Sequence, residues 1–368
     1  MARRSKPSRH AGVLLVDKPL GPTSHDVVGW VRWALDERSV GHCGTLDPAA
    51  SGLLVICVGE ATKLVELLTG VDKSYRARFV LGRSTTTADA EGETLAEAPV
   101  AAGDVERAAA VLGELLGPLM LPPPAYSAVK LAGKRAHELA RAGETLELAP
   151  RPMAVHSLEI LARGPDWLDV ELTVAKGTYV RSLAEELGRR LDLPVHLGGL
   201  RRLACGGLRV DDAVGGLVAA RLPTLADDRR AKPAPRWRID MGEPGDEGGA
   251  GDADGSGPER RRRASEALLA GLEAPWTRLP CPVTFVSEEH ASTFERLLQG
   301  QKLGRRQALA LGLEPEPVPS TRVLIGPGHR TMVIAQIQPR GQDGDLCLAP
   351  ARVIRLPASG VPLEGENT

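Results

Sequence analysis

One stretch near the middle of the chain limits how the chain can fold more than any other feature. Residues 240–259, DMGEPGDEGGAGDADGSGPE, contain seven acidic residues and no Lys or Arg. So few apolar side chains cannot offset the entropy that is lost when a backbone becomes ordered. We therefore predict an acidic, Gly-rich linker over 235–265, which separates two folded parts, 11–234 and 266–358. The chain ends, 1–10 and 359–368, are expected to be disordered.

The same stretch changes what the charge of the protein implies. The whole chain has a formal charge of −1, from 46 basic and 47 acidic residues. Without the seven acids of 240–259, 46 basic residues face 40 acidic ones, which is a balance of +6. A mildly basic folded part is compatible with a nucleic-acid partner. The run RRRR at 260–263 could contact RNA, or the acids before it could screen it.

Apolar runs and cysteines indicate the compartment. No apolar run approaches the ~20 residues that cross a bilayer, and no apolar signal core follows the basic start, MARRSKPSRH. The five cysteines, at 43, 57, 205, 281 and 347, show no CxxC spacing. This is typical of a reducing compartment. We therefore expect a cytoplasmic protein that does not span a membrane.

Before the linker, hydrophobic patterns alternate between strand and helix periods. Residues 167–177, WLDVELTVAKG, alternate like a half-exposed strand, whereas LLVICVG (53–59) is apolar throughout and predicts a buried strand. Further strands are predicted at 12–19 and 74–82, and helices at 23–37, 61–70, 104–117, 133–143 and 178–191. The absence of a strict βαβ rhythm favours an α+β domain around a mixed, mainly antiparallel sheet. After the linker, short apolar runs predict a small β-rich domain.

A single carboxylate lies in the stretch GHCGTLDPAASG (41–52). Pro48 follows Asp47, and a residue before proline is pushed toward extended geometry, so Asp47 is not on a helix face. An acid on a Gly-rich loop beside a buried strand is one way to build a catalytic carboxylate. The alternative is an Asx-turn, in which Asp47 only bonds its own backbone.

The segment KGTYVRSLAEELG (176–188) places a cation where a helix begins. We expect Gly177 to turn the chain, Thr178 to cap the helix, and Tyr179 and Arg181 to lie in its first turn. The helix dipole disfavours a cation there, so Arg181 points to an anionic partner, either a carboxylate or a phosphate. A pair with Asp47 would keep that acid ionised; the alternative is a surface arginine.

The three tyrosines of the chain lie in basic segments, DKSYRAR, PPPAYSAVK and KGTYVR. Aromatic rings among Lys and Arg suit base stacking on an RNA strand, although structural tyrosines would look the same. No HExxH, GxxxxGK[ST] or GxSxG motif is present, so we expect neither a metal site nor a nucleotide-binding or serine-hydrolase site. Lys18 in DKPLGPTSHD could reach a phosphate or extend along the surface.

Six segments together resemble the TruB family of tRNA pseudouridine synthases over roughly 11–212. They are GVLLVDKPLGPTSHDVV, GHCGTLDPAASGLLVICVGEATKL, DKSYRARFVLGRSTTTADAEG, PPPAYSAVKLAGKRAHELAR, KGTYVRSLAEELG and GLRRLACG. The resemblance implies an α+β catalytic domain, a PUA-like RNA-binding domain at 266–358, and isomerisation of uridine 55 in the T loop of tRNA to pseudouridine. It implies no cofactor and no metal. We expect a monomer that binds the T arm of tRNA.

The resemblance also implies roles for particular residues. Asp47 corresponds to the catalytic aspartate, Tyr75 to the active-site tyrosine, and Arg181 to the arginine paired with the aspartate. The residues expected to bind the substrate are His42, which helps to displace the target base, Tyr75, Tyr179, Leu200 and Lys18.

Two questions stay open at this point. Asp47 could attack C1′, attack C6, or act through a glycal route. A protein that only binds tRNA and assists its folding would share the tyrosines, the basic balance and the β-rich end, but it would not need Asp47, Tyr75 and Arg181. A hydrolase with a nucleophilic aspartate would need a second acid or a metal nearby, and the sequence indicates neither.

Overall fold

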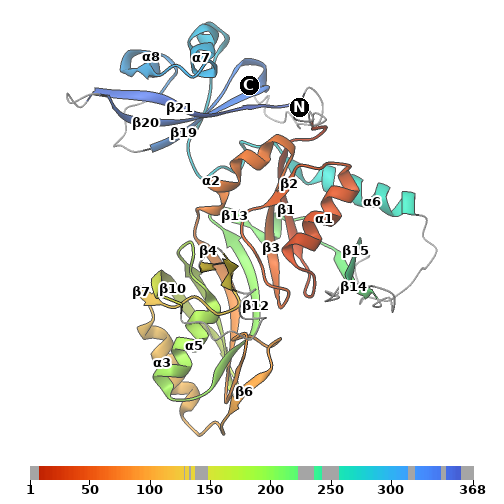
Figure 1. Ribbon diagram of the computed structural model, residues 1–368, viewed down its shortest axis with the longest axis vertical. Coiled ribbons are helices and arrows are strands. Elements are labelled where there is room, and N and C mark those ends of the chain that lie inside the picture. The colour runs from red at the N-terminus through yellow and green to blue at the C-terminus, as the bar shows by residue number, and fades with distance from the viewer. Residues whose placement is uncertain are drawn as a thin grey trace.

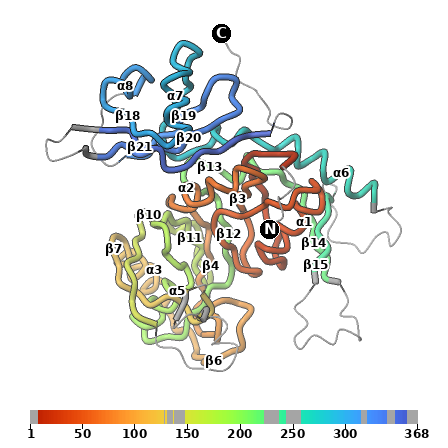
Figure 2. Tube along the Cα trace, turned by 45° about the horizontal axis from the view of Figure 1, so that its top comes forward, coloured from red at the N-terminus to blue at the C-terminus, as the bar shows by residue number. Residues whose placement is uncertain are grey.

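The computed structural model describes residues 8–127, 129–131, 134–136, 148–222, 236–242, 257–313, 320–340 and 345–357. A long sheet with helices on its sides forms the larger part, and a separate curled sheet with two short helices lies at one end of it (Figures 1 and 2). Within the described residues, no helix is both long and apolar enough to cross a membrane.

The large sheet is mixed and mainly antiparallel, as predicted. Its main path runs β16-β1-β3-β12-β4-β11-β10-β7, with β2 paired to β3 and β13 to β12. The parallel pair in it is β3 with β12, which aligns Ala50 with Leu200 and Gly52 with Arg202. The strands are β1 (Gly12–Lys18), β2 (Val40–His42), β3 (Ala50–Val58), β4 (Lys73–Leu81), β7 (Gly117–Leu121), β10 (Arg151–Arg163), β11 (Trp167–Val174), β12 (Val195–Cys205), β13 (Leu208–Arg209) and β16 (Leu272–Glu273).

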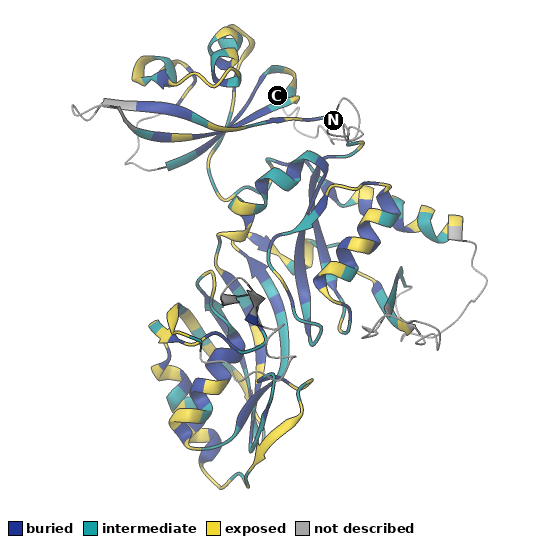
Figure 3. Cartoon of the chain, viewed as in Figure 1, coloured by how far each residue is buried: buried dark blue, intermediate teal, exposed yellow. Residues whose placement is uncertain are grey.

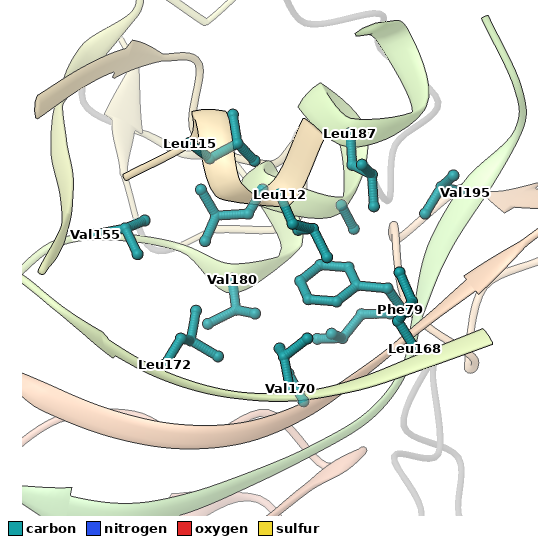
Figure 4. Close-up of a cluster of buried hydrophobic side chains, with 14 of the residues drawn as sticks. Phe79, Leu112, Leu115, Val155, Leu168, Val170, Leu172, Val180, Leu187 and Val195 are labelled. Carbon is teal, nitrogen blue, oxygen red and sulfur yellow. The ribbon is translucent and has the colours of Figure 1, made fainter. Parts of the chain in front are cut away.

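Helices α3 (Asp104–Glu114) and α5 (Val180–Leu191) cover one half of this sheet. Strand β4 alternates, so that Tyr75, Ala77 and Phe79 are buried while Arg76 and Arg78 are exposed. Figure 4 shows Phe79 rising from the sheet among the side chains of both helices. Burial of such residues removes apolar surface from water and is the main favourable term in folding. The same alternation faces Tyr75 toward α5.

The other half of the sheet is covered by α1 (Ser24–Leu35). A capping box starts this helix, because the Thr23 hydroxyl accepts from the Asp26 backbone N–H and the Asp26 carboxylate accepts from Thr23. The predicted helix at 61–70 is a 3-10 turn, η1 (Gly59–Leu64), followed by a short helix, α2 (Val65–Thr69). The predicted helix at 133–143 lies largely outside the described residues. Next to it, two short strands, β8 (Lys130–Leu131) and β9 (Lys134–Arg135), pair antiparallel.

The segment predicted as a linker, 235–265, is folded at both ends, which corrects that prediction. Strand β15 (Arg236–Met241) pairs with β14 (Leu217–Leu222), and helix α6 (Gly257–Ala270) lies beside α1 (Figure 2). Ala264 and Leu268, one helical turn apart, are buried against α1. Residues 243–256 lie outside the described part. The prediction relied on the acidic composition of the whole stretch and overlooked this pair of apolar residues.

Two of the four arginines at 260–263 attach α6 to acids of the same domain. Arg260 pairs with Asp240 and lies over the Trp33 ring, 4.7 Å from its centroid. Arg261 pairs with Asp36 at 3.4 Å. Strand β16 then joins β1, so the N-terminal domain extends to residue 273 and beyond the predicted boundary.

The C-terminal domain is the expected β-rich unit. Its sheet runs β17-β19-β20-β21-β18, with α7 (Ala291–Leu298) and α8 (Arg305–Ala310) beside it. The strands are β17 (Val283–Phe285), β18 (Leu303–Gly304), β19 (Ser320–Ile325), β20 (Thr331–Arg340) and β21 (Asp345–Arg355). Figure 3 shows buried residues alternating with intermediate and exposed ones along its strands, and the last four residues of β19 are buried. One sheet face shares a hydrophobic cluster with the N-terminal domain, to which Leu64 and Ile325 both belong.

Candidate active site

Asp47 lies in the loop between β2 and β3, on the side of the sheet that α5 covers. Its backbone carbonyl accepts a hydrogen bond from the N–H of Ala50, 3.0 Å away, where β3 begins. The buried Arg202 side chain of β12 donates to the carbonyls of Gly44 at 3.1 Å and Leu53 at 2.6 Å. The loop is therefore attached both to the strand after it and to a neighbouring strand.

Arg181 and Asp47 form an ion pair. Arg181 Nη2 lies 2.9 Å from Asp47 Oδ2, and the side chains are 7% and 39% exposed, respectively. The guanidinium is thus buried, whereas the carboxylate is partly exposed to solvent. Arg181 also donates to the carbonyls of Thr87 at 3.1 Å and Tyr126 at 2.9 Å. These bonds hold the planar fork in one orientation, a geometry that lysine cannot reproduce.

The beginning of α5 differs in one detail from the prediction. Tyr179, not Thr178, is the N-cap residue, and it makes no capping bond with its side chain. The Thr178 hydroxyl instead bonds the backbone of Ala154 on β10. Gly177 has a φ of +83°, a conformation that favours glycine. The chain therefore turns at Gly177 just before α5, and the bonds between Thr178 and β10 hold that turn in place. Arg181 follows in the first turn of the helix.

Asp89 is a site residue that sequence reasoning missed. Its buried carboxylate lies 3.8 Å from Arg181 Nε, so the guanidinium stands between two acids, Asp47 and Asp89. The Asp89 carboxylate also accepts from the hydroxyl of Thr87 and from the backbone N–H of Glu91. In the sequence, Asp89 is visible only as the aspartate of the segment TTTADAEG. Its spacing along the chain gives no indication that it meets Arg181.

Tyr75 and Leu200 lie on adjacent strands and face the same side. In the pairing of β4 with β12, Tyr75 is opposite Arg202 and Ala77 is opposite Leu200. Burial raises the pKa of Tyr75, while the guanidinium of Arg202 lowers it. The phenol is therefore neutral near pH 7.

A small cavity that opens to solvent lies at the ion pair. Its lining comes from four parts of the chain: Asp47, Ala49, Ala50, Asp89, Arg181, Leu197, Gly198, Gly199 and Leu200. Tyr179 does not line it, but packs against the same hydrophobic cluster as Leu200. The Asp47 carboxylate is therefore part of the wall of a cavity that solvent reaches.

His42 lies at the end of β2, just before the loop. Its ring meets the exposed His25 ring edge-on, with centroids 5.3 Å apart. Burial, together with the neighbouring His25 and Arg202, lowers the pKa of His42 to about 4, so the ring is neutral at pH 7. Its Nδ1 is buried and has no hydrogen-bond partner in the described part of the chain.

Lys18 is not at the surface. Its ammonium donates to the carbonyls of Pro19 at 2.9 Å and Pro22 at 2.7 Å, and the residue is fully buried. Burial lowers the pKa of Lys18 to about 8, against the attraction of Asp47, which raises it. This placement favours a structural role in the loop before α1 over contact with a phosphate.

The described residues include no group of three or more His, Cys, Asp or Glu that could hold a metal ion. Two acids, Asp47 and Asp89, both face Arg181. The arrangement offers a partly exposed carboxylate, a buried guanidinium that orients it, and apolar side chains around it.

Comparison with known proteins identifies the family. Residues 32–180 match the model of the TruB family pseudouridylate synthase (N terminal domain). A tRNA pseudouridine synthase B from Cereibacter sphaeroides is 46% identical over 227 residues, which cover 61% of this chain and 74% of that protein. The enzyme of the same name from Nocardia farcinica is 45% identical over 252 residues, covering 66% and 78%. This chain belongs to the TruB family. It is a pseudouridine synthase.

Solved structures agree with the TruB fold. The crystal structure of a Cbf5-Nop10-Gar1 complex superposes with a TM-score of 0.55 at 20% identity, over 94% of this chain and 85% of that one. The structure of an H/ACA RNP bound to a substrate RNA containing 2′-deoxyuridine gives 0.54 at 18% identity, over the same shares. This likeness concerns the fold, and it confirms the α+β catalytic domain and the β-rich, PUA-like domain.

Proposed function

We propose that this TruB family member converts uridine 55 in the T loop of tRNA to pseudouridine, with Asp47 as the catalytic residue. Two relatives named tRNA pseudouridine synthase B, at 46% and 45% identity, support tRNA as the substrate. The observation that carries the proposal is the ion pair of Asp47 with Arg181 at an open cavity.

The reaction is an isomerisation. The C1′–N1 bond of the uridine breaks, the uracil turns, a C1′–C5 bond forms, and C5 loses a proton while N1 gains one. An ionised carboxylate suits this chemistry because it can act as a nucleophile or accept a proton from the sugar. Attack at C1′, attack at C6 and the glycal route each need the oxygen of Asp47 close to the target nucleotide. The half-exposed Asp47 carboxylate meets that need.

Arg181 supports this chemistry through its ion pair with Asp47. Its Nη2 lies 2.9 Å from Asp47 Oδ2 and so holds that carboxylate in one orientation. Because Arg181 is also bonded to two backbone carbonyls and faces Asp89, its position does not depend on the substrate. Such preorganised groups need no reorganisation during the reaction.

The target base must leave its stack before Asp47 can reach it, which costs a few kcal/mol. We propose that the neutral His42 ring, beside His25 at the edge of the loop, occupies the space that the base leaves. Leu200, Tyr75 and Tyr179 would then pack around the uracil. The raised pKa of Tyr75 makes its phenol a poor base, so we expect it to contact the base ring and not to remove the C5 proton.

Replacing Asp47 by Asn tests the catalytic assignment. The Asp47→Asn variant keeps the shape but loses the charge, so isomerisation should fall on the order of 10³-fold or more while tRNA binding is largely retained. Tritium release from tRNA labelled at C5 of uridine measures turnover, and nearest-neighbour mapping shows whether position 55 is the site.

Asp169→Asn is the matched control, because Asp169 pairs with Arg78 on the other side of the sheet. Turnover of Asp47→Asn near that of this control would exclude Asp47 as the catalytic residue. A tRNA folding chaperone without catalysis would release no tritium even as the wild-type protein.

We further propose that the protein acts as a monomer on the T arm, in the cytoplasm. All five cysteines are free thiols, as expected in a reducing compartment. Light scattering of the protein with a T-arm hairpin would give a one-to-one complex, whereas a two-to-two mass would contradict the monomer.

A further inference from the structure

The backbone on both sides of Asp47 is attached to one short segment of the chain. Before Asp47, the hydroxyl of Ser24 donates to the carbonyl of Leu46 at 3.0 Å and accepts from its N–H at 2.8 Å. After Asp47, the carbonyl of Pro48 accepts from the N–H of Gly21 at 2.9 Å. Both neighbours of the catalytic acid are thus held from residues 21–24.

The Ser24 hydroxyl is available for this contact because another residue caps the helix. Serine at a helix start commonly serves its own backbone. Here Thr23 is the N-cap, and it forms a complete capping box with Asp26. Ser24, in the first turn of α1, is 1% exposed and directs its hydroxyl across to a residue 22 positions away.

Leu46 needs such a partner. Its side chain is 3% exposed and belongs to the cluster under α3 and α5, and its backbone lies outside the strands of the sheet. A buried backbone group without a hydrogen bond is costly. Ser24 satisfies both groups of Leu46, in the way that a neighbouring strand would.

We propose that Ser24 is a positioning residue for Asp47. By holding both backbone groups of Leu46, it fixes the backbone position of the next residue, Asp47. That position decides whether the Asp47 carboxylate keeps its 2.9 Å contact with Arg181 while it faces the cavity. Small displacements of a reacting group are expensive in rate, because proximity and orientation carry much of the catalytic effect. This inference rests on the proposed role of Asp47.

The Ser24→Ala variant tests it by single-turnover kinetics on an unmodified tRNA transcript, with enzyme in excess. We expect the rate at saturation to fall about 10- to 100-fold with the Kd for the transcript unchanged. A role in folding alone would lower the melting temperature but leave the rate of the folded protein intact. All rates are therefore measured well below the melting temperature of each variant.

Two further variants make the result specific. Ser24→Thr keeps a hydroxyl and should restore most of the rate, whereas Ser24→Cys keeps the shape with a weak donor and should behave like alanine. Ser39→Ala is the matched control, because it also removes a hydroxyl bonded to a backbone carbonyl, that of Gly59, but at the far end of β3. Its rate should equal the wild-type rate.

A folded Ser24→Ala protein with the rate of Ser39→Ala would overturn the proposal, as would a loss that higher enzyme concentration abolishes. If Ser24→Ala does not fold, Ser24→Cys against Ser24→Thr decides in the same way. The Asp47→Asn variant separates this failure from that of the proposed function. An active Asp47→Asn rejects the catalytic assignment, whereas an inactive Asp47→Asn with a fully active Ser24→Ala rejects only the positioning role.

Discussion

At the scale of single residues, Arg181 determines the character of the site. Its guanidinium faces two carboxylates and two backbone carbonyls while it is 7% exposed. A buried cation would be unfavourable without such partners. Of the two acids, only Asp47 is substantially exposed, since its side chain is 39% exposed and that of Asp89 is 8% exposed. This asymmetry indicates which carboxylate meets the substrate.

The Arg181→Lys variant tests that arrangement. Lysine keeps the charge but cannot form the fork that reaches these four acceptors. We expect turnover to fall on the order of 10²-fold, measured by tritium release. Arg189→Lys, on the exposed side of the same helix and paired with Glu186, is the control and should retain wild-type turnover. Equal activity of the two variants would argue against an orienting role for the fork.

At the scale of elements, α6 shows how a composition can mislead. The helix begins with a basic run, and Arg262 pairs with Glu259 and Glu266 within it. Exposed pairs of this kind contribute little to stability. The helix is held instead by Ala264 and Leu268, which reach the cluster that α1 forms on the sheet. Helix α6, part of which the composition predicts to be a linker, thus belongs to the N-terminal domain.

Leu268→Ala distinguishes a packed helix from a linker. Leu268 is fully buried, so truncation should lower the free energy of unfolding by about 3 kcal/mol. Leu269→Ala changes the next residue, which is 37% exposed, and should cost about 0.5 kcal/mol or less. Chemical denaturation measures both. Equal, small effects would show that α6 does not contribute to the fold.

At the scale of the whole molecule, the two domains share a hydrophobic cluster. Ile325, Met332 and Ile354 lie opposite one another on β19, β20 and β21, and all three belong to the cluster that contains Leu64 and Leu68. The alternate residues of these strands, such as Leu324 and Val333, belong to the cluster with α7. A sheet with both faces apolar must be covered on both sides.

This packing predicts cooperative unfolding. Differential scanning calorimetry should give one transition, and Met332→Ala should shift it as a whole, with a loss of about 3 kcal/mol because Met332 is fully buried. Domains joined only by a flexible connection would give two transitions, of which the substitution would move one. That second result would contradict a shared core.

The sequence by itself determined most of the elements before the acidic stretch, and it singled out Asp47 as a candidate. Strand and helix periods, Pro48 after Asp47 and Gly177 at the turn before α5 are local features, and the backbone follows them. The tertiary structure alone decided the partners, because strand register and helix packing bring together residues far apart in the chain. Arg181 reaches Thr87 across 94 positions and Arg202 reaches Leu53 across 149. No period in the sequence reports such contacts, so Asp89, Ser24 and Arg202 became visible as parts of the site only in the folded chain.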